Sequence, residues 1–300
     1  MAPKISSSSD LQSLAEEFEV ENGAHKFKRT VFAALDDDDV AYWGAKEGIR
    51  KYFISPEEFE ATLQPIPDDW MFPDLTDDLA KEITIADTDD GSVIASEDLF
   101  IKRPKLSAYD PEEVGRYLPS APRMLLEEIH ILETLSKNPH PNIVRYHGAR
   151  VRRGRVTGIL LSRHSTTLDS IENNKPLKES LDRNRITTDL ESAVAHLHAL
   201  GLAHNDINPT NILIGRDKEA VLADFGSCQP VGKGLMFSRG TPGWMDEGSN
   251  YETSEMRHDL VGLRKVGEWM ENVWEGKKTG TGSYPLEGLP REFLEARGLA

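Results

Sequence analysis

Two short segments in the second half of this 300-residue chain restrict its fold more than any other feature. HNDINPTNILI occupies residues 204–214 and VLADFGS occupies residues 221–227. Apolar β-type runs adjoin both segments, which predicts two loops held by short strands. A single Asp or Asn in such a loop would be an ordinary turn or cap residue. Asp206 and Asp224, however, are eighteen residues apart in a fixed pattern, and the two segments together point to chemistry.

The pattern matches what phosphoryl transfer requires, namely a group that orients the attacking hydroxyl, oxygen ligands for magnesium and a cation on the nucleotide phosphates. Asp206 and Asn211 stand in an H-x-D-x-x-x-x-N frame, and Asp224 opens a D-F-G triplet. On these motifs, about residues 80–275 resemble the eukaryotic protein kinase superfamily, and more closely divergent kinase-like proteins common in fungi. The resemblance implies that Asp206 orients the substrate hydroxyl and that Asn211 and Asp224 bind Mg²⁺.

The same resemblance assigns a nucleotide site to the first half of the domain. Lys102, at the end of LFIK, would contact the phosphates as a catalytic residue, with Glu128 as its helix partner and Glu127 as the neighbour it could be confused with. An exposed lysine and a solvent-facing glutamate are the structural alternatives. The remaining residues implied to bind the cofactor ATP belong to the glycine-rich loop and to the hinge near residues 161–164: Gly91, Val93, Leu161 and Arg163.

Downstream, GTPGWMDEG at 240–248 resembles the end of an activation segment, in which Thr241 would frame the substrate hydroxyl. Asp259, in RHDLVGL, lies where the family has a buried aspartate that accepts hydrogen bonds from the catalytic-loop backbone. We expect Asp259 to be structural. The 41 residues after Asp259 predict a shortened C-terminal lobe.

The chain departs from the family at three places. Ala86 and Thr88 occupy the first two glycine positions of the phosphate loop, and Gly91 occupies the third. The carboxylates interspersed among these positions, Asp87, Asp89 and Asp90, should repel phosphate. Asn205 replaces the arginine that would bind a phosphorylated activation loop. Asn208 replaces a lysine that contacts the transferring phosphate, which removes a cation from the transition state. Small-molecule kinases of the aminoglycoside-phosphotransferase type use the same frame without that lysine.

The expected fold is α+β and two-lobed, with a small β-rich N-lobe at about 76–162 containing one helix and a mainly helical, shortened C-lobe at about 163–300. Residues 1–75 would be an acidic extension, partly helical or disordered. Helix-like segments are expected from Leu11 to about Leu63, and SPEEFEATL offers Ser55 as N-cap with Pro56 at the first helical position. Five strands are expected in the lobes, in a small antiparallel sheet: Glu82–Ala86, Ser92–Ala95, Glu97–Lys102, Ile143–Tyr146 and Val156–Leu161. Two helices are also expected. One carries the apolar stripe Met124, Leu125, Ile129, Leu132 and Leu135, and the other is Ile186–Leu200.

Charge is concentrated at the N-terminal end. Residues 1–90 carry a net charge of −14, against −16 for the whole chain, and such a surface disfavours nucleic acid and anionic membranes as partners. The run Asp36–Asp39 lacks the spaced ligands of a calcium loop, so a metal role is disfavoured. The basic turn RVRRGR at 150–155 reads either as a phosphate site or, preferably, as solubilising charge.

Taken together, the sequence predicts an ATP- and Mg²⁺-dependent phosphotransferase, foremost a protein kinase acting on serine or threonine of a protein substrate. Two alternatives stay open: a pseudokinase that serves as a binding module, and a small-molecule kinase. We expect a monomer. A cytoplasmic location, with a nuclear one as the alternative, follows from the lack of an apolar leader and of any long apolar stretch, and the single Cys228 agrees with it.

Overall fold

The computed structural model describes residues 2–21, 24–87, 98–106, 109, 111, 120–236, 239–246 and 251–277. The chain folds as two compact units, the first formed by residues 1–94, 101–127 and 148–160 and the second by residues 95–100, 128–147 and 161–300. Among the helices of the described ranges, none combines the length and apolarity that a membrane crossing requires.

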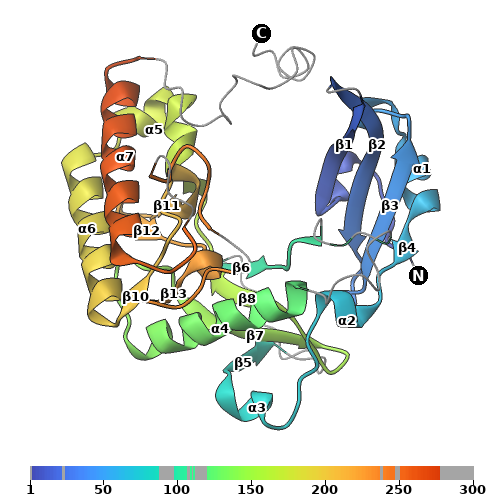
Figure 1. Ribbon diagram of the computed structural model, residues 1–300, viewed down its shortest axis with the longest axis horizontal. Helices are drawn as coiled ribbons and strands as arrows, with labels where there is room; N and C mark the ends of the chain where they lie inside the picture. Colours follow the sequence, from blue (N-terminus) through green and yellow to red (C-terminus); the bar gives the residue numbers. More distant parts are fainter. Residues whose placement is uncertain are drawn as a thin grey trace. The chain divides into compact units, whose positions relative to one another are not determined.

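The first unit begins with an antiparallel sheet of strand order β1-β2-β3-β4 (Figure 1). Its strands are β1 (Ser13–Glu21), β2 (Ala24–Leu35), β3 (Ala41–Glu47) and β4 (Gln64–Pro65). The expectation of helices here was therefore wrong for residues 13–47. The alternation Glu-Phe-Glu-Val-Glu at 17–21 has the two-residue period of a strand, and this period outweighs the good helix propensity of Glu and Ala.

The one predicted helix of this region is confirmed as α1 (Pro56–Thr62). Ser55 is its N-cap, because the Ser55 Oγ accepts a hydrogen bond from the Glu58 N–H at 3.3 Å and the Ser55 N–H donates to Glu58 Oε2 at 3.0 Å. Phe59 then packs edge-on against Phe32 of β2, with ring centroids 4.7 Å apart. This aromatic pair fixes α1 on one face of the sheet.

Apolar cores lie on both sides of this sheet. The core beneath α1 consists of Ile5, Phe32, Ala34, Tyr42, Ile54, Phe59 and Leu63. The opposite core consists of Ala33, Ala41, Ile66, Met71, Phe72, Leu106 and Ala121. Because Leu106 and Ala121 lie far along the sequence, the N-terminal sheet is built into the first unit rather than appended to it. Two short helices accompany it, α2 (Asp68–Met71) and α3 (Leu79–Glu82).

The acidic run Asp36–Asp39 forms the turn between β2 and β3. Asp36 Oδ1 accepts hydrogen bonds from the backbone N–H groups of Asp38 and Val40, which closes the turn. Asp39 takes a left-handed conformation with φ of 61°, and its side chain is only 2% exposed. The run is thus a structural turn that buries one carboxylate.

The Asp39 carboxylate meets two arginines and a hydroxyl. Its Oδ2 accepts hydrogen bonds from Arg150 Nε at 2.7 Å and Thr157 Oγ1 at 2.6 Å, and lies 2.7 Å from Arg103 Nη1. Burial raises the pKa of Asp39, but the hydrogen bonds from Arg150, Arg103 and Thr157 and the charge of Arg103 outweigh it and lower that pKa below its ordinary value.

The basic turn 150–155 is neither a phosphate site nor free solubilising charge. Arg153 pairs with Asp68 at 2.6 Å, and Arg155 pairs with Asp69 at 2.7 Å and Asp74 at 3.1 Å. The arginines of this turn thus neutralise carboxylates of the N-terminal region within the same unit. Sequence alone could not pair them, because Asp68 lies 85 residues from Arg153 and Asp69 lies 86 residues from Arg155.

A second sheet has the order β5-β7-β8-β6. Its strands are β5 (Ile85–Asp87), β6 (Leu99–Lys102), β7 (Tyr146–Arg152) and β8 (Arg155–Ser162). The expectation of a wholly antiparallel sheet was wrong, because β5 pairs with β7 in parallel, which the long connection between them permits. Gly148 lies at this pairing with φ of +136°, and a Cβ there would come within 2.6 Å of Ala86 Cβ. The expected strand 92–95 lies outside the described residues.

The second unit is mainly helical, as expected. Its longer helices are α4 (Ala121–Lys137, from residue 128 on), α6 (Arg183–Ala199) and α7 (Met256–Trp274), and its shorter elements are α5 (Lys175–Glu179), β9 (Thr166–Thr167), β10 (Leu202–Ala203), β11 (Ile212–Ile214), β12 (Ala220–Leu222) and β13 (Gln229–Pro230). The predicted stripe of α4 is confirmed from Leu125 to Leu135, whose apolar members are buried. The expected strand 143–146 is wrong except for Tyr146, because Ile143 makes only an isolated bridge with Leu222.

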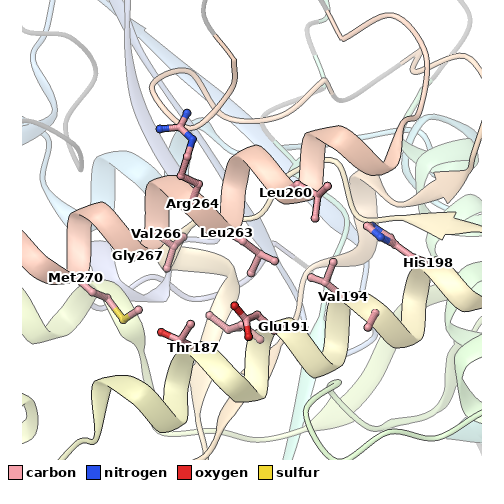
Figure 2. Close-up of a pocket in the computed structure, with 12 residues that line it drawn as sticks. Thr187, Glu191, Val194, His198, Leu260, Leu263, Arg264, Val266, Gly267 and Met270 are labelled. Carbon is pink, nitrogen blue, oxygen red and sulfur yellow. The ribbon is translucent and has the colours of Figure 1, made fainter.

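Helices α6 and α7 lie side by side (Figure 1). They leave an apolar groove of about 520 Å³ between them, whose lining side chains are drawn in Figure 2. Val194 of α6 and Leu263 of α7 line it, and Leu260 is 57% exposed at its edge. His198 also lines the groove, and its ring contacts the buried Asp259. The groove therefore borders a buried carboxylate of α7.

Replacing Asp39 tests how much the buried carboxylate contributes. Asp39→Asn removes the counter-charge that Arg103 and Arg150 share, so we expect the free energy of unfolding to fall by about 3–5 kcal/mol. Because the pKa of Asp39 is lowered in the folded state, its contribution is complete above about pH 4, the ordinary Asp value, and disappears as pH falls through the folded pKa. Urea denaturation at pH 7 and at pH 3 measures both effects.

Asp37→Asn is the matched control, since Asp37 belongs to the same turn and is exposed. The assignment fails if the two variants unfold at the same urea concentration.

Candidate active site

The loop 204–211 connects β10 to β11 and carries Asp206. The Asp206 N–H donates to His204 Nδ1 at 3.3 Å, and His204 Nε2 lies 3.0 Å from the carbonyl oxygen of Ala223. Since Nδ1 accepts, the hydrogen-bond network assigns the imidazole proton to Nε2. The His204 ring is fully buried and meets the Phe225 ring edge-on at 5.1 Å. This one ring therefore ties the loop to the D-F-G triplet.

The Asp206 carboxylate is held by two amides. Asn208 Nδ2 donates to Asp206 Oδ1 at 3.0 Å, and Asn211 Nδ2 donates to Asp206 Oδ2 at 3.2 Å and to the Asp206 carbonyl oxygen at 2.8 Å. Both donors are uncharged, so they orient the carboxylate without neutralising it. An oriented carboxylate suits acceptance of a hydroxyl proton.

Asn208 also reaches the segment after the triplet. Its Nδ2 lies 3.3 Å from Thr241 Oγ1, and its Oδ1 accepts from the N–H of Thr210 at 3.0 Å and from the Thr210 hydroxyl at 2.6 Å. Asn208 is therefore a bridge between Asp206 and Thr241. Sequence reasoning treated it only as a lost cation, because the partner across the bridge lies 33 residues away.

Asp224 adopts a left-handed conformation with φ of 59°, and its Oδ1 accepts from the Gly226 N–H at 3.4 Å. A Cβ placed on Gly226 would lie 3.3 Å from Asp224 Oδ1 and 3.7 Å from Glu128 Oε2. The carboxylates of Glu128 and Asp224 thus flank the same glycine. Glu128 is 6% exposed, so the solvent-facing alternative for this residue is wrong.

The residues expected to hold magnesium fit that ion chemically. The side-chain nitrogen of Asn211, Nδ2, donates to Asp206, so the side-chain oxygen Oδ1 is the Asn211 atom suited to bind the metal. Asp224 supplies a carboxylate, and the N–H of Ala223 beside it donates to the Asn211 backbone carbonyl oxygen at 2.9 Å. One or two protein oxygens, completed by water and phosphate, is the usual magnesium environment. In the described ranges, no cluster of three or more His, Cys, Asp or Glu side chains suited to a metal is present.

Asp259 supports the loop from α7. It is fully buried, its Oδ1 accepts from the Asn205 N–H at 2.8 Å, and its Oδ2 accepts from the His204 N–H at 2.9 Å. His198 Nε2 lies 2.9 Å from the same Oδ2. Asp259 therefore makes the backbone contacts expected of a structural aspartate. The sequence did not indicate its contact with His198.

The other candidate residues divide between the units. Lys102 belongs to the first unit, where its carbonyl oxygen would lie 2.9 Å from a Cβ on Gly158. Leu161 is buried in β8, and Arg163 places its guanidinium 5.9 Å from the centre of the Phe100 ring, both in the second unit. Gly91 and Val93 lie outside the described residues.

Asp259→Asn tests the support of the loop. One oxygen is replaced by an amide that cannot accept, so a buried N–H or His198 loses its partner, and we expect a loss of about 2–3 kcal/mol in the free energy of unfolding. Urea denaturation measures the loss. Asp217→Asn, at an exposed aspartate of the same unit, is the control. Equal stability of the two variants would contradict the supporting role of Asp259.

Comparison with known proteins is consistent with this geometry. Residues 106–247 match the family model described as protein kinase domain. The matched range contains Glu128, Asp206, Asn211 and Asp224, whereas Lys102 lies outside it.

Curated relatives are protein kinases of much greater length. MAP kinase kinase kinase SSK2 of Saccharomyces cerevisiae is 26% identical over 145 residues, which cover 48% of this chain and 8% of SSK2. Dual specificity testis-specific protein kinase 2 of Homo sapiens is 31% identical over 130 residues, which cover 40% of this chain and 22% of that protein. This chain thus spans less than a quarter of either relative.

Among solved structures, the yeast RNA Pol II CTD kinase CTDK-1 complex contains a chain that aligns with a TM-score of 0.45 and 18% identity, over 55% of this chain and 54% of that one. Because the TM-score is below 0.5, no functional inference rests on this likeness. The family model and the curated relatives agree, and together they support the eukaryotic protein kinase superfamily for residues 106–247 of the chain.

Proposed function

We propose that the chain is an ATP- and Mg²⁺-dependent phosphotransferase that acts on a serine or threonine hydroxyl of a protein. The observation that carries the proposal is the Asp206 carboxylate, held by Asn208 and Asn211 while Asn208 also contacts Thr241. A substrate hydroxyl that enters beside Thr241 meets an oriented carboxylate able to accept its proton. Thr241 supports a protein substrate, because the family resemblance places it in a substrate-framing segment.

Each further residue has one role in this proposal. Asn211 and Asp224 hold Mg²⁺, which when bound neutralises charge on the phosphates. Lys102 contacts the nucleotide phosphates and Glu128 orients it. Gly91 and Val93 contribute to the phosphate loop, and Leu161 and Arg163 to the adenine site. A monomeric state and a cytoplasmic location remain part of the proposal.

One observation favours a second candidate, a pseudokinase that binds partners. Within the described part of the chain, both side-chain donors to the Asp206 carboxylate are neutral amides. Without a cation there, charge that develops on the transferring phosphate has less stabilisation, and removal of one such group costs about 10²–10³ in rate in other enzymes. A small-molecule kinase, the third candidate, would show transfer to a small hydroxyl compound instead of a peptide.

Thermal unfolding with and without Mg²⁺-ATP tests the site. At ATP about 100-fold above its Kd, binding stabilises the native state by about 2.7 kcal/mol, so the wild type should show a Tm increase of several degrees. Asp224→Asn removes the carboxylate ligand and should abolish the increase. Asp206→Asn should keep the increase but lower phosphotransfer to a Ser/Thr peptide mixture by about 10²–10⁴-fold.

Asp217→Asn serves as the control in both assays and should match the wild type. A wild type with a Tm increase but without transfer would support the pseudokinase, and the lack of any Mg²⁺-ATP effect on Tm would contradict the nucleotide site itself.

A further inference from the structure

The side-chain amide of Asn205 is fully engaged in hydrogen bonds. Its Nδ2 donates to the carbonyl oxygens of Ala203 at 2.8 Å and Ser227 at 3.0 Å and to Ser254 Oγ at 3.0 Å. Its Oδ1 accepts from the backbone N–H of Glu255 at 3.3 Å. Because a backbone N–H can only donate, this contact fixes which end of the amide is oxygen. Asn205 therefore connects the catalytic loop, the D-F-G turn and the residues that lead into α7.

The same oxygen fixes the state of His258. His258 Nδ1 lies 2.9 Å from Asn205 Oδ1, so Nδ1 must carry the proton. His258 Nε2 is buried and has no hydrogen-bond partner in the part of the chain that the structure describes. Burial lowers the pKa of His258, although the carboxylates of Glu255, Asp259 and Asp246 oppose this effect and Arg257 adds to it. The contact between Asn205 and His258 is thus one between two uncharged groups.

His258 continues the connection to a third residue. Its ring stacks on the Tyr251 ring, with centroids 3.5 Å apart and planes inclined by 11°. The Tyr251 hydroxyl in turn accepts a hydrogen bond from the Asp246 N–H at 3.1 Å. Asp246 ends the described segment 239–246, which contains Thr241. Ring packing and one hydrogen bond therefore join the catalytic loop to this segment.

The segment also touches the loop directly. Gly240 has φ of +91°, and a Cβ there would lie only 2.9 Å from the Asn205 carbonyl oxygen. Thr241, the next residue, lies within 3.3 Å of the Asn208 amide. Two contacts at one end of the segment and the Asp246–Tyr251 bond at the other therefore enclose residues 240–246.

We propose that Asn205, His258 and Tyr251 form an uncharged clamp that positions Thr241 against the catalytic loop. These are positioning residues, since they act through Asp246 and through the loop backbone. Their effect on catalysis rests on the proposed function, whereas their effect on the position of segment 239–246 does not.

Amide hydrogen exchange of the full-length chain tests the clamp. Tyr251→Phe keeps the ring stack and removes the acceptor for the Asp246 N–H, so we expect about fivefold faster exchange in residues 240–246 with unchanged exchange in α6. His258→Asn keeps a donor to Asn205 but removes the ring. It should therefore speed exchange in residues 240–246 and leave residues 203–206 protected.

Tyr146→Phe is the matched control, because Tyr146 is also buried and its hydroxyl bonds to Glu133 in the same unit. Unchanged exchange at 240–246 in Tyr251→Phe overturns the clamp, as does equal acceleration in Tyr146→Phe or a uniform increase across α6.

Kinetics distinguish the clamp from the proposed function. In a chain that phosphorylates a Ser/Thr peptide, Tyr251→Phe should raise KM for the peptide or lower kcat by about fivefold and leave KM for ATP unchanged. If kcat and the KM values for peptide and ATP all worsen by the same factor, the variant has only lost stability, and the positioning role is contradicted. A wild type without phosphotransfer contradicts the proposed function alone, because the exchange experiment still decides the clamp.

Discussion

The carboxylate of Asp259 is the constraint on which the rest of the second unit depends. It accepts hydrogen bonds from two consecutive backbone N–H groups, those of His204 and Asn205, and so sets the path of the chain just before Asp206. A buried carboxylate without such donors would be very costly, so the loop and α7 stabilise each other. Asn205 itself has a left-handed backbone conformation with φ of 64°. The geometry of the site therefore begins in α7.

From this anchor, the site is built with neutral groups. Asn208 and Asn211 hold Asp206, and the ring of His204 joins the loop to Ala223. Neutral amides orient the Asp206 carboxylate without placing a positive charge beside it. In the proposed function, magnesium and Lys102 neutralise the negative charge of the phosphates, because the side chains around Asp206 are uncharged. This division explains why the chain can differ from its family at Asn208 and still hold Asp206 in place.

Sequence reasoning succeeded where local geometry fixes residue types at short spacing, as in the capping box at Ser55, whose two partners are three positions apart. The motifs at 204–211 and 224–226 also have short spacing, and the catalytic roles assigned to them stay predictions. Sequence reasoning failed where partners are distant. Strands of the N-terminal sheet have Glu- and Ala-rich sequences, and Asp39 finds Arg150 across more than a hundred residues. The pairing of these strands and the contact of Asp39 with Arg150 depend on tertiary packing. The pattern of a single sequence carries no information about which distant segments pack together.

The position of Asp39 has a consequence for how the acidic N-terminal region can be studied. A chain that began at residue 76 would lack Asp39, Asp68 and Asp69 but would keep the arginines that they neutralise. It would also uncover Leu106 and Ala121, which complete a core shared with the N-terminal sheet. Such a truncated protein would bind polyanions and associate with itself through surfaces that the full chain buries. Its altered behaviour would report these newly exposed surfaces and not a property of the full chain.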